Sequence, residues 1–403
     1  MKCAIIMAGG KGTRMKATCP KVMCNVLFEP MISYVVDAVK EAGAEDICVI
    51  TGYKHELLEK YLAEKDEKIE TVLQEPQLGT GHAVMQAQSF IDRHLDDDII
   101  ILNGDGPLID AETINKAFDY HKENDNSITL ISAIVDDTNG IGHIQRDENG
   151  KLLRIIEHKD ANDEEKKINE SNAGFYWFNG RDLSYALSKI TNNNAQNEYY
   201  ITDSLEILIS AGKNVGAYVV ENNEVTLGAN DRKQLNNLNN IMRRNINDKH
   251  MINGVDIPCT DGVMIGKNVK IGSSTVILPN TIILGNTVIG ENCTSYRRDS
   301  YSFIFHTHFL NDFGNEFVYH TVTATRAVVH GVIVHQSRFF VNQILGFDYF
   351  FFSHNFISLS VGEPYKKLHQ LDKDCRAAYV DKHFEIIFCY KVGDDGCNSQ
   401  YHK

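Results

Sequence analysis

Short apolar runs alternate with segments of helical periodicity over the first 225 residues. Residues 4–7, 47–51 and 98–102 are apolar runs, and residues 31–42 repeat apolar side chains at helical spacing. The Ile-Ile-Ile-Leu run that ends at Leu102 has no polar alternation, so both faces of that strand must be buried, as in a parallel sheet covered by helices. This β-α-β alternation predicts a doubly wound, mainly parallel α/β domain. Ligands of such a domain bind beyond the carboxyl ends of its strands.

A repeat of six residues follows a helix that the pattern predicts at residues 230–250. Isoleucine recurs at this spacing at Ile265, Ile271, Ile277, Ile283 and Ile289. An α-helix cannot keep a period of six on one face, whereas each side of a left-handed parallel β-helix turns one such aliphatic residue inward. We therefore expect residues 251–294 to form the first coils of a β-helix, in preference to a chance spacing in ordinary strands.

The repeat stops where a sixth Ile-Gly is due, and residues 295–403 differ in composition from the rest. This tail carries no net charge, although the whole chain carries −14, and it holds 14 of the 19 Phe and 9 of the 16 His. We interpret residues 295–403 as an unassigned tail, either frame-shifted or poorly ordered. A frame shift requires Ile-Gly hexads in a shifted frame after codon 294, which the nucleotide sequence would reveal.

Charge, hydropathy and cysteine usage exclude several classes of protein. An excess of 54 acidic over 40 basic residues argues against general nucleic-acid binding, which needs a basic surface. No run of 18 apolar residues predicts a transmembrane helix, and the first ten residues are too short and too lightly charged for a secretory signal. Nine scattered cysteines without a C-x-x-C pair disfavour a disulfide framework or zinc site and favour the cytoplasm.

Candidate chemistry begins directly after the first apolar run, in Ala-Gly-Gly-Lys-Gly-Thr-Arg followed by Pro20-Lys21. Glycines let a backbone approach a phosphate chain closely and point N–H groups at it. Arg14 and Lys21 carry the charge needed to neutralise a triphosphate and a departing pyrophosphate. The loop fits neither the G-x-G-x-x-G nor the P-loop pattern, so a structural turn with surface cations remains an alternative.

Two further motifs follow predicted strands. In Gln-Glu-Pro-Gln-Leu-Gly-Thr-Gly-His-Ala, Gln74 is suited to a base edge and Gly79-Thr80 to the close approach of a flat base, while His82 fits a helix start better than a catalyst. In Asn-Gly-Asp, Asp105 places a carboxylate at a strand's carboxyl end, where it suits Mg²⁺. A turn-forming role for Asp105 is the alternative.

These motifs, together with Glu-His-Lys-Asp-Ala at 157–161 and Asn-Asn-Asn-Ala-Gln-Asn-Glu-Tyr-Tyr-Ile-Thr-Asp at 192–203, make the chain resemble one family. It is the bacterial bifunctional UDP-N-acetylglucosamine pyrophosphorylase and glucosamine-1-phosphate N-acetyltransferase. The resemblance covers residues 1 to about 294. It implies a pyrophosphorylase, that is a uridylyltransferase, domain over residues 1–229, with the connecting helix and β-helix start after it.

The resemblance also implies roles for individual residues. The UTP phosphates would be held by Met7, Ala8, Gly9, Gly10, Lys11, Arg14 and Lys21, with Arg14 and Lys21 as catalytic residues. Uracil would be read by Gln74, Gly79 and Thr80, and N-acetylglucosamine by Gly140, Glu157 and Asn172. Asn103 and Gly104 complete the substrate site, and Mg²⁺ would be bound by Asp105 and Asn230.

The implied reaction is uridylyl transfer from UTP to N-acetylglucosamine 1-phosphate, which gives UDP-N-acetylglucosamine and pyrophosphate for peptidoglycan and lipopolysaccharide synthesis. The sugar phosphate would attack the α-phosphorus in line, so positioning and charge neutralisation suffice and no covalent nucleophile is needed. Two alternatives stay open. One is another sugar-1-phosphate nucleotidyltransferase, and the other is a sugar-nucleotide-binding protein without turnover.

The chain departs from the family pattern at several positions. Glu29 stands where the family has Lys, Ile141 and His143 where it has Tyr and Arg, and Gly106 where a larger residue is usual. The family's acetyltransferase site and its homotrimer depend on later β-helix coils, whose pattern is absent after residue 294. We therefore expect the acetyltransferase activity to be lost, and the resemblance gives no basis here for the trimer.

Overall fold

The computed structural model describes residues 1–294 apart from Asp137 and Asn139, and beyond residue 294 only the backbone of short strands. These strands pair antiparallel two by two: β16 (Tyr296–Arg298) with β17 (Ser302–Ile304), β18 (His306–Leu310) with β19 (Glu316–His320), β20 (Phe347–Ser353) with β21 (Phe356–Val361), and β22 (Ala378–Asp381) with β23 (Ile386–Cys389). The expectation of a frame-shifted or poorly ordered tail otherwise lies outside the described residues. The chain divides into two compact units, residues 1–242 and 243–403.

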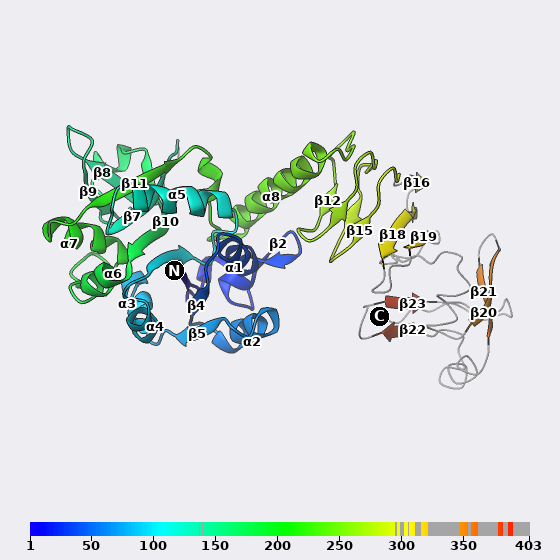
Figure 1. The fold of residues 1–403 in the computed structure, drawn as a ribbon, viewed down its shortest axis with the longest axis horizontal. Coiled ribbons are helices and arrows are strands. Elements are labelled where there is room, and N and C mark those ends of the chain that lie inside the picture. The colour runs from blue at the N-terminus through cyan, green and yellow to red at the C-terminus, as the bar shows by residue number, and fades with distance from the viewer. Residues whose placement is uncertain are drawn as a thin grey trace. The chain divides into compact units, whose positions relative to one another are not determined.

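The first unit is built on one nine-stranded sheet (Figure 1). Seven strands lie side by side in the order β11-β7-β10-β6-β1-β4-β5, and β8 and β9 extend the sheet from β10. Their bounds are β1 Lys2–Met7, β4 Asp46–Thr51, β5 Glu70–Leu73, β6 Asp98–Asn103, β7 Ile128–Ile134, β8 His143–Arg146, β9 Leu152–Ile156, β10 Glu170–Asn179 and β11 Val215–Val220. A small hairpin, β2 (Asn25–Val26) with β3 (Glu29–Pro30), stands apart from this sheet.

Helices cover both faces of the sheet, as the continuous apolar strands predict. One face packs against α1 (Met31–Glu41), α2 (His55–Lys65) and α5 (Ala111–Glu123), and the other against α3 (Thr80–Gln86), α4 (Gln88–Arg93), α6 (Gly180–Leu187) and α7 (Ser204–Ser210). Neighbouring residues of β6 show the division: Ile100 belongs to the first core and Ile101 to the second. Both side chains are at most 1% exposed.

The sheet is mainly parallel, as expected, but it is mixed, because β10 runs against the other strands of the seven-stranded order. β1 pairs parallel with β4 and β6, but β10 runs antiparallel to both of its neighbours, β6 and β7. A parallel neighbour needs a crossover connection, usually a helix. The segment between β9 and β10 holds only the short 3₁₀ turn η3 (Glu165–Lys167), so β10 enters the gap between β6 and β7 from the opposite end.

The order of the strands around β1 determines where the site lies. The chain winds from β1 to β4 and β5 on one side, then returns to place β6 on the other side of β1. The carboxyl ends of β1 and β6 therefore flank the point at which the winding reverses, which is where open α/β sheets bind ligands. Short 3₁₀ turns shape the loops nearby: η1 (Thr13–Met15), η2 (Lys21–Met23), η4 (Ile201–Asp203) and η5 (Asn223–Thr226).

The second unit contains parallel strand pairs whose partners lie 18 residues apart. β12 (Met264–Ile265) pairs with β14 (Ile282–Ile283), and β13 (Lys270–Ile271) pairs with β15 (Val288–Ile289). Left-handed backbone conformations recur at multiples of six, at Gly262, Ser274, Asn280 and Asn292. The repeated isoleucines point inward: Ile265, Ile277, Ile283 and Ile289 are at most 4% exposed, while Ile271 is half-buried.

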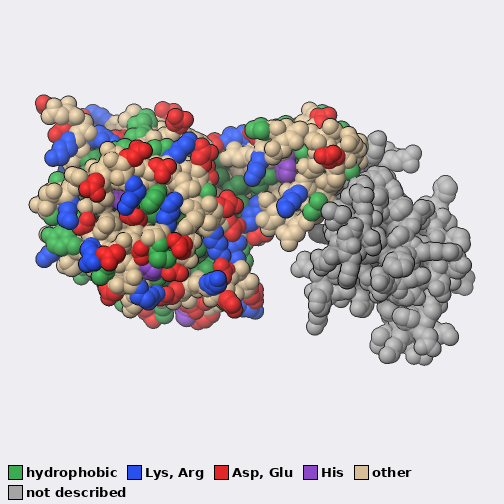
Figure 2. All heavy atoms as spheres, in the orientation of Figure 1, with side chains coloured by type: hydrophobic (Ala, Val, Ile, Leu, Met, Phe, Trp, Pro, Cys, Tyr) green, Lys and Arg blue, Asp and Glu red, His purple; other side chains and the backbone are tan. Residues whose placement is uncertain are grey.

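The helix α8 (Arg232–Ile252) starts in the first unit and ends in the second. It matches the helix predicted at 230–250 within two residues at each end. Among the described residues, no helix is both long and apolar enough to cross a membrane. On the face of the first unit seen in Figure 2, acidic and basic side chains are interspersed.

Candidate active site

The loop that follows β1 forms one wall of the candidate site. Residues 8–21 contain four cationic residues and no acidic residue, in a chain whose net charge is −14. Within the described residues, the backbone N–H groups of Gly10, Lys11 and Gly12 donate to no other residue. A Cβ added at Gly10 would meet no atom within 4 Å. Open N–H groups in a loop whose charged residues are all cationic are suited to binding an anion.

Contacts from outside hold this loop in shape. Lys54 donates from Nζ to the carbonyl of Thr18 at 2.5 Å, and Arg232 donates from Nε to the carbonyl of Met15 at 3.1 Å. The Lys11 ammonium lies 5.5 Å from the ring centre of Tyr53. The Arg14 side chain, by contrast, is exposed and makes no hydrogen bond or ion pair within the described residues. Arg14 is therefore a cation available to a ligand.

Lys21 joins the loop to the two residues expected to bind metal. Its Nζ donates to Oδ1 of Asn230 at 2.7 Å and forms an ion pair with Asp105. The Lys21 and Asp105 side chains are 13% and 24% exposed. A Cβ at Gly12 would come within 2.7 Å of the Lys21 Cβ, so only glycine lets the loop pass this close. Residues far apart in the sequence thus meet at the carboxyl ends of β1 and β6.

The donor atoms around Lys21 fit a magnesium ion. Asp105 offers a carboxylate and Asn230 an amide oxygen, and both already converge on one cationic group. Hard oxygen donors of this kind are the ligands that Mg²⁺ prefers, with phosphate oxygens and water completing its shell. Gly228 keeps the two segments close, because a Cβ there would lie 3.2 Å from the Asp105 carbonyl.

The motif after β5 lies against the glycine loop. Gln77 donates from Nε2 to the Gly9 carbonyl, and a Cβ at Gly9 would come within 3.0 Å of Gln74 Oε1. Gln74 is 6% exposed and donates from Nε2 to the Gly79 carbonyl at 3.0 Å. His82 lies in the first turn of α3, within 3.3 Å of the same amide nitrogen, as expected of a helix-start residue. Gln77 was not singled out from the sequence.

The segment 78–81 is fixed by the loop from the family motif at 192–203. Tyr199 donates its N–H to the Leu78 carbonyl at 2.8 Å, and Gly81 donates its N–H to the Tyr199 carbonyl at 2.7 Å. The Thr80 hydroxyl accepts the N–H of Ile201 at 3.1 Å. Gly79 adopts a φ of 107°, and a Cβ there would lie 2.5 Å from the Tyr199 carbonyl. These bonds to the 199–201 segment fix the position of Thr80, whose side chain stays exposed.

The residues expected to hold the sugar form a second group. Glu157 accepts the hydroxyl of Thr202 at 3.0 Å, and burial raises the pKa of the Glu157 carboxyl. Asn172 donates from Nδ2 to the Tyr176 hydroxyl at 2.6 Å and accepts the Gly174 N–H at 3.0 Å. Thr202 lies in the quoted 192–203 motif, which is the signal that could have identified it.

Gly140 stands apart from this group. It lies on an exposed turn with a φ of 78°, and a Cβ there would meet no atom within 4 Å. The neighbouring Gly142 is closer to the sugar residues, since its carbonyl accepts the Asn172 N–H at 2.8 Å.

Asn103 joins the two groups. A Cβ at Gly174 would lie 2.0 Å from Asn103 Nδ2, so β10 lies directly beside the end of β6 in the sheet. Gly104 donates its N–H to the Met7 carbonyl at 2.9 Å, which ties the end of β6 to that of β1. The loop at residues 8–21, the oxygen donors of Asp105 and Asn230, and the group around Glu157 and Asn172 are therefore connected through the ends of β1 and β6.

The departures from the family pattern have local structural counterparts. A Cβ at Gly106 would meet the Phe175 ring at 2.8 Å, so Phe175 fills the space of a larger residue. His143 is fully buried, with Nε2 3.2 Å from His158 Nδ1 and Nδ1 3.1 Å from the Ile168 carbonyl. His143, which stands at the position of the family's arginine, stacks its ring on that of His158, the residue after Glu157.

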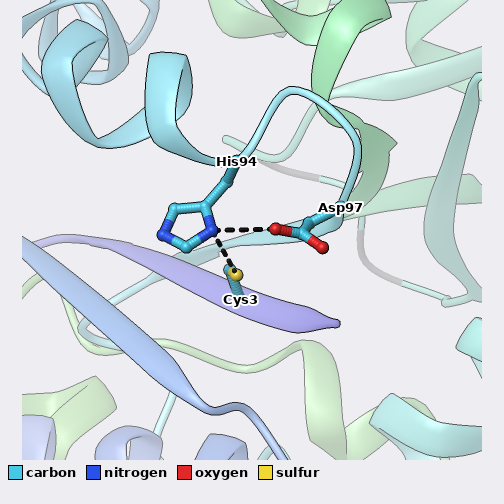
Figure 3. A group of neighbouring side chains, drawn as sticks. All are labelled: Cys3, His94 and Asp97. Carbon is cyan, nitrogen blue, oxygen red and sulfur yellow. Dashed lines mark hydrogen bonds and ion pairs between the residues drawn. The ribbon is translucent and has the colours of Figure 1, made fainter.

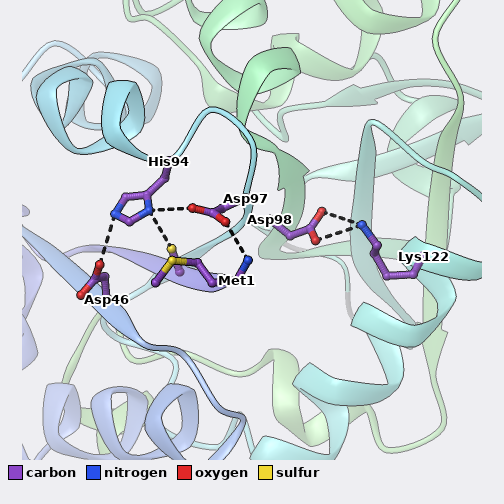
Figure 4. A network of polar contacts seen from close by, with 7 residues as sticks. Met1, Asp46, His94, Asp97, Asp98 and Lys122 are labelled. Carbon is purple, nitrogen blue, oxygen red and sulfur yellow. Dashed lines mark hydrogen bonds and ion pairs between the residues drawn. The ribbon is translucent and has the colours of Figure 1, made fainter.

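A second polar cluster lies at the opposite, amino ends of β1 and β6 (Figure 3). His94 Nδ1 is 3.2 Å from Cys3 Sγ and 3.0 Å from Asp97 Oδ2, and the three ligand atoms lie within 4.8 Å of one another. Figure 4 shows that its groups already have partners: the Met1 amine donates to Asp97 at 2.6 Å, and His94 Nε2 lies 3.4 Å from Asp46. Burial raises the pKa of the Cys3 thiol to about 12, so it stays protonated. The cluster ties strand ends together.

Comparison with known proteins agrees with this geometry. The family model for nucleotidyl transferases matches residues 3–229, from the start of β1 to the residue before Asn230. The chain belongs to the nucleotidyl transferase family.

Curated relatives give a narrower resemblance. The bifunctional protein GlmU of Caldanaerobacter subterraneus subsp. tengcongensis is 45% identical over 290 residues, and that of Clostridioides difficile strain 630 is 44% identical over 290 residues. Each match covers 72% of this chain and 62% of the relative. The resemblance seen in the sequence motifs is thus confirmed for the pyrophosphorylase half. The chain spans less than two thirds of the length of these relatives.

Proposed function

We propose that the first unit transfers the uridylyl group of UTP to N-acetylglucosamine 1-phosphate, producing UDP-N-acetylglucosamine and pyrophosphate. The observation that carries this proposal is the convergence of Lys21, Asp105 and Asn230 beside an acid-free loop with open N–H groups. That combination suits a polyphosphate with a divalent ion. The relatives named bifunctional protein GlmU support the choice of uridine and of the acetylated sugar.

The residues present account for the catalysis that phosphoryl transfer requires. The N–H groups of Gly10, Lys11 and Gly12 would hold the β- and γ-phosphates, and Arg14 and Lys21 would neutralise the pyrophosphate as it leaves. The sugar 1-phosphate oxygen would then attack the α-phosphorus from the opposite side, guided by the group around Glu157 and Asn172. Positioning two anions in line accounts for most of the rate gain.

Magnesium would be held by Asp105 and Asn230, with phosphate oxygens completing its coordination. A bound Mg²⁺ supplies charge neutralisation for the phosphates. Gln74, Gly79 and Thr80 are proposed to read uracil. The Gln74 amide nitrogen is already used by Gly79, so its contribution to base recognition would come through Oε1 or through the shape of the loop.

The decisive experiment is pyrophosphate release by the purified full chain with UTP, Mg²⁺ and N-acetylglucosamine 1-phosphate. We expect turnover that needs all three. Faster turnover with another nucleoside triphosphate or with glucose 1-phosphate would support the second candidate, another sugar nucleotidyltransferase. Tight binding of UDP-N-acetylglucosamine without any pyrophosphate release would support a binding protein without turnover. The replacement of family residues by Ile141 and His143 is the reason to consider this alternative.

The organisation of the chain is also a proposal. We assign residues 1–229 to the uridylyltransferase domain, 230–250 to a connecting helix, 251–294 to the start of a left-handed parallel β-helix, and 295–403 to an unassigned tail. Strand partners 18 residues apart support the β-helix, since three sides of six residues complete one coil. The loss of acetyltransferase activity, the cytoplasmic location and the oligomeric state stay predictions. Acetylation of glucosamine 1-phosphate by the purified chain would contradict the first.

A further inference from the structure

Two cysteines flank Pro20-Lys21 in the candidate site. The Sγ atoms of Cys19 and Cys24 lie 4.0 Å apart. Cys19 is partly exposed, whereas Cys24 is 5% exposed. Within the described residues this is the one contact between two thiols at 4.0 Å or less. A disulfide needs about 2.04 Å between the sulfur atoms, so an approach of about 2 Å would join them.

The surrounding contacts determine which side would move. The Cys24 N–H donates to the Lys21 carbonyl at 3.0 Å, and the Cys24 carbonyl accepts the N–H of Met31 at 3.1 Å. Cys24 is therefore fixed to the start of α1, while the partly exposed Cys19 lies on the far side of Lys21. Closing the gap would draw the Cys19–Lys21 stretch toward Cys24.

Lys21 has little freedom to follow such a movement. Its Nζ is shared between Asn230 and Asp105, and its Cβ lies so close to Gly12 that an added Cβ there would approach to 2.7 Å. A displacement of Lys21 would thus break its bonds to the metal donors or push the glycine loop. A misplacement of about 1 Å in a catalytic site can cost about 100-fold in rate.

We propose that Cys19 and Cys24 form an oxidation site, at which a peroxide converts the dithiol to a disulfide and displaces Lys21. The Cys19 sulfur attacks the peroxide oxygen, giving a sulfenic acid and one water. The Cys24 sulfur then attacks the Cys19 sulfur, forming the S–S bond and releasing a second water. Two thiols and one hydrogen peroxide thus become one disulfide and two water molecules, and a dithiol reductant reverses the change.

The bond is detected independently of activity. The purified full chain is treated with hydrogen peroxide, its remaining thiols are alkylated, and the unfolded protein is digested with trypsin. Cleavage after Lys16, Lys21 and Lys40 places the two cysteines on separate peptides, residues 17–21 and 22–40. We expect these two peptides to be joined, and to separate on reduction. Recovery of both peptides unjoined, with Cys19 oxidised to an acid, would overturn the proposal.

The effect on Lys21 rests on the proposed function and is measured by pyrophosphate release. Peroxide should lower wild-type turnover about 100-fold, and dithiothreitol should restore it. Cys19→Ser should resist peroxide, whereas Cys259→Ser, which removes an exposed cysteine elsewhere, should behave as wild type. Joined peptides with unchanged turnover would overturn the displacement of Lys21. Joined peptides in a chain that shows no turnover even when reduced would leave the oxidation site standing and count against uridylyl transfer.

Discussion

Strands β1 and β6 carry a polar cluster at each end, and the two clusters differ in how their charges are satisfied. At the amino ends, a continuous series of contacts runs from the Met1 amine through Asp97 and His94 to Asp46. At the carboxyl ends, Lys21 alone serves both Asp105 and Asn230, and Arg14 has no partner within the described residues.

The difference distinguishes a structural cluster from a ligand site. The pKa of the Asp97 carboxyl is lowered, chiefly by its hydrogen bond from the chain's amine, so its charge is used within the protein. In the 8–21 loop, Lys21 is paired with Asp105, whereas the exposed Arg14 makes no hydrogen bond or ion pair within the described residues. Charges that the protein leaves unmatched are the ones available to a substrate. Predictions about the two ends therefore concern different properties: turnover at one and stability at the other.

The largest expected effect is that of Lys21→Ala at the carboxyl ends. Removing this ammonium takes away charge that would stabilise the leaving pyrophosphate, so pyrophosphate release should fall by about 100- to 1000-fold, in the range seen when one preorganised donor is lost. Pyrophosphate release by Asp105→Ala should be reduced to a similar extent at every Mg²⁺ concentration. The melting temperature of each variant is the control for folding. A full rate in either purified variant would count against the site.

The next effect tests the amino ends. His94 is 5% exposed, its ring centre lies 4.6 Å from that of Phe90 in a tilted arrangement, and its Nδ1 is within hydrogen-bond distance of Cys3 and Asp97. His94→Ala should lower the free energy of unfolding by about 2 kcal/mol, as is usual when a buried hydrogen-bonded group is removed. Denaturant unfolding measures this loss, and pyrophosphate release at a temperature well below melting should be unchanged. A large loss of turnover in the folded variant would break the comparison.

The sequence was sufficient for the features set by local pattern and strand direction. The continuous apolar strand that ends at Leu102 predicted burial on both faces, and the rule for carboxyl ends predicted that Lys21 and Asp105 would meet. The repeat of six predicted which isoleucines are buried in the second unit. Asn230 could be assigned only by resemblance, because nothing in its local sequence distinguishes it from a turn residue.

Features set by long-range packing could not be predicted. The position of β10 between β6 and β7 and its antiparallel direction depend on contacts with strands far away in the sequence. The sequence of β10 itself indicates only one more apolar strand. The helical segment after Gly79 is broken at Ala87, where α3 ends and α4 begins, although no glycine or proline marks the break. The bond from Gln77 to Gly9 joins loops 68 residues apart, and glutamine has no local pattern that signals such a bond.

A third prediction concerns Asp203, a partly buried carboxylate in η4 near Glu157 and Glu206. Burial, followed by repulsion from Glu206 and Glu157, raises the pKa of Asp203 from 3.8 to about 6. The folded state therefore holds a proton more tightly than the unfolded state, so stability falls as pH rises from about 4 to 6 and the cost persists at neutral pH. Asp203→Asn should raise the melting temperature at pH 7.5 by about 2 °C or more and reduce its slope between these pH values.

Glu206→Gln is the matched control for Asp203→Asn. It removes one of the repelling charges but leaves Asp203 ionisable, so its melting temperature should keep part of the pH dependence. An Asp203→Asn variant with an unchanged pH profile would show that this carboxylate is satisfied in solution. Asp203 would then resemble the satisfied carboxylate of Asp97 at the amino ends.

The smallest effect comes from the hairpin β2–β3, whose turn is made by Leu27 and Phe28. Leu27 and Phe28 adopt positive φ values of 39° and 75°, a turn that favours glycine or asparagine. Phe28 is 38% exposed, so Phe28→Gly loses little burial and relieves backbone strain worth about 1–2 kcal/mol, partly offset by the flexibility of glycine when unfolded. We expect a net gain of about 1 kcal/mol in the free energy of unfolding, measured with denaturant.

Leu27→Gly, at the 2% exposed neighbour, is the matched control and should destabilise the protein, because there the loss of packing exceeds the relief of strain. Equal effects at both positions would mean that backbone strain at Phe28 does not lower the stability of this turn.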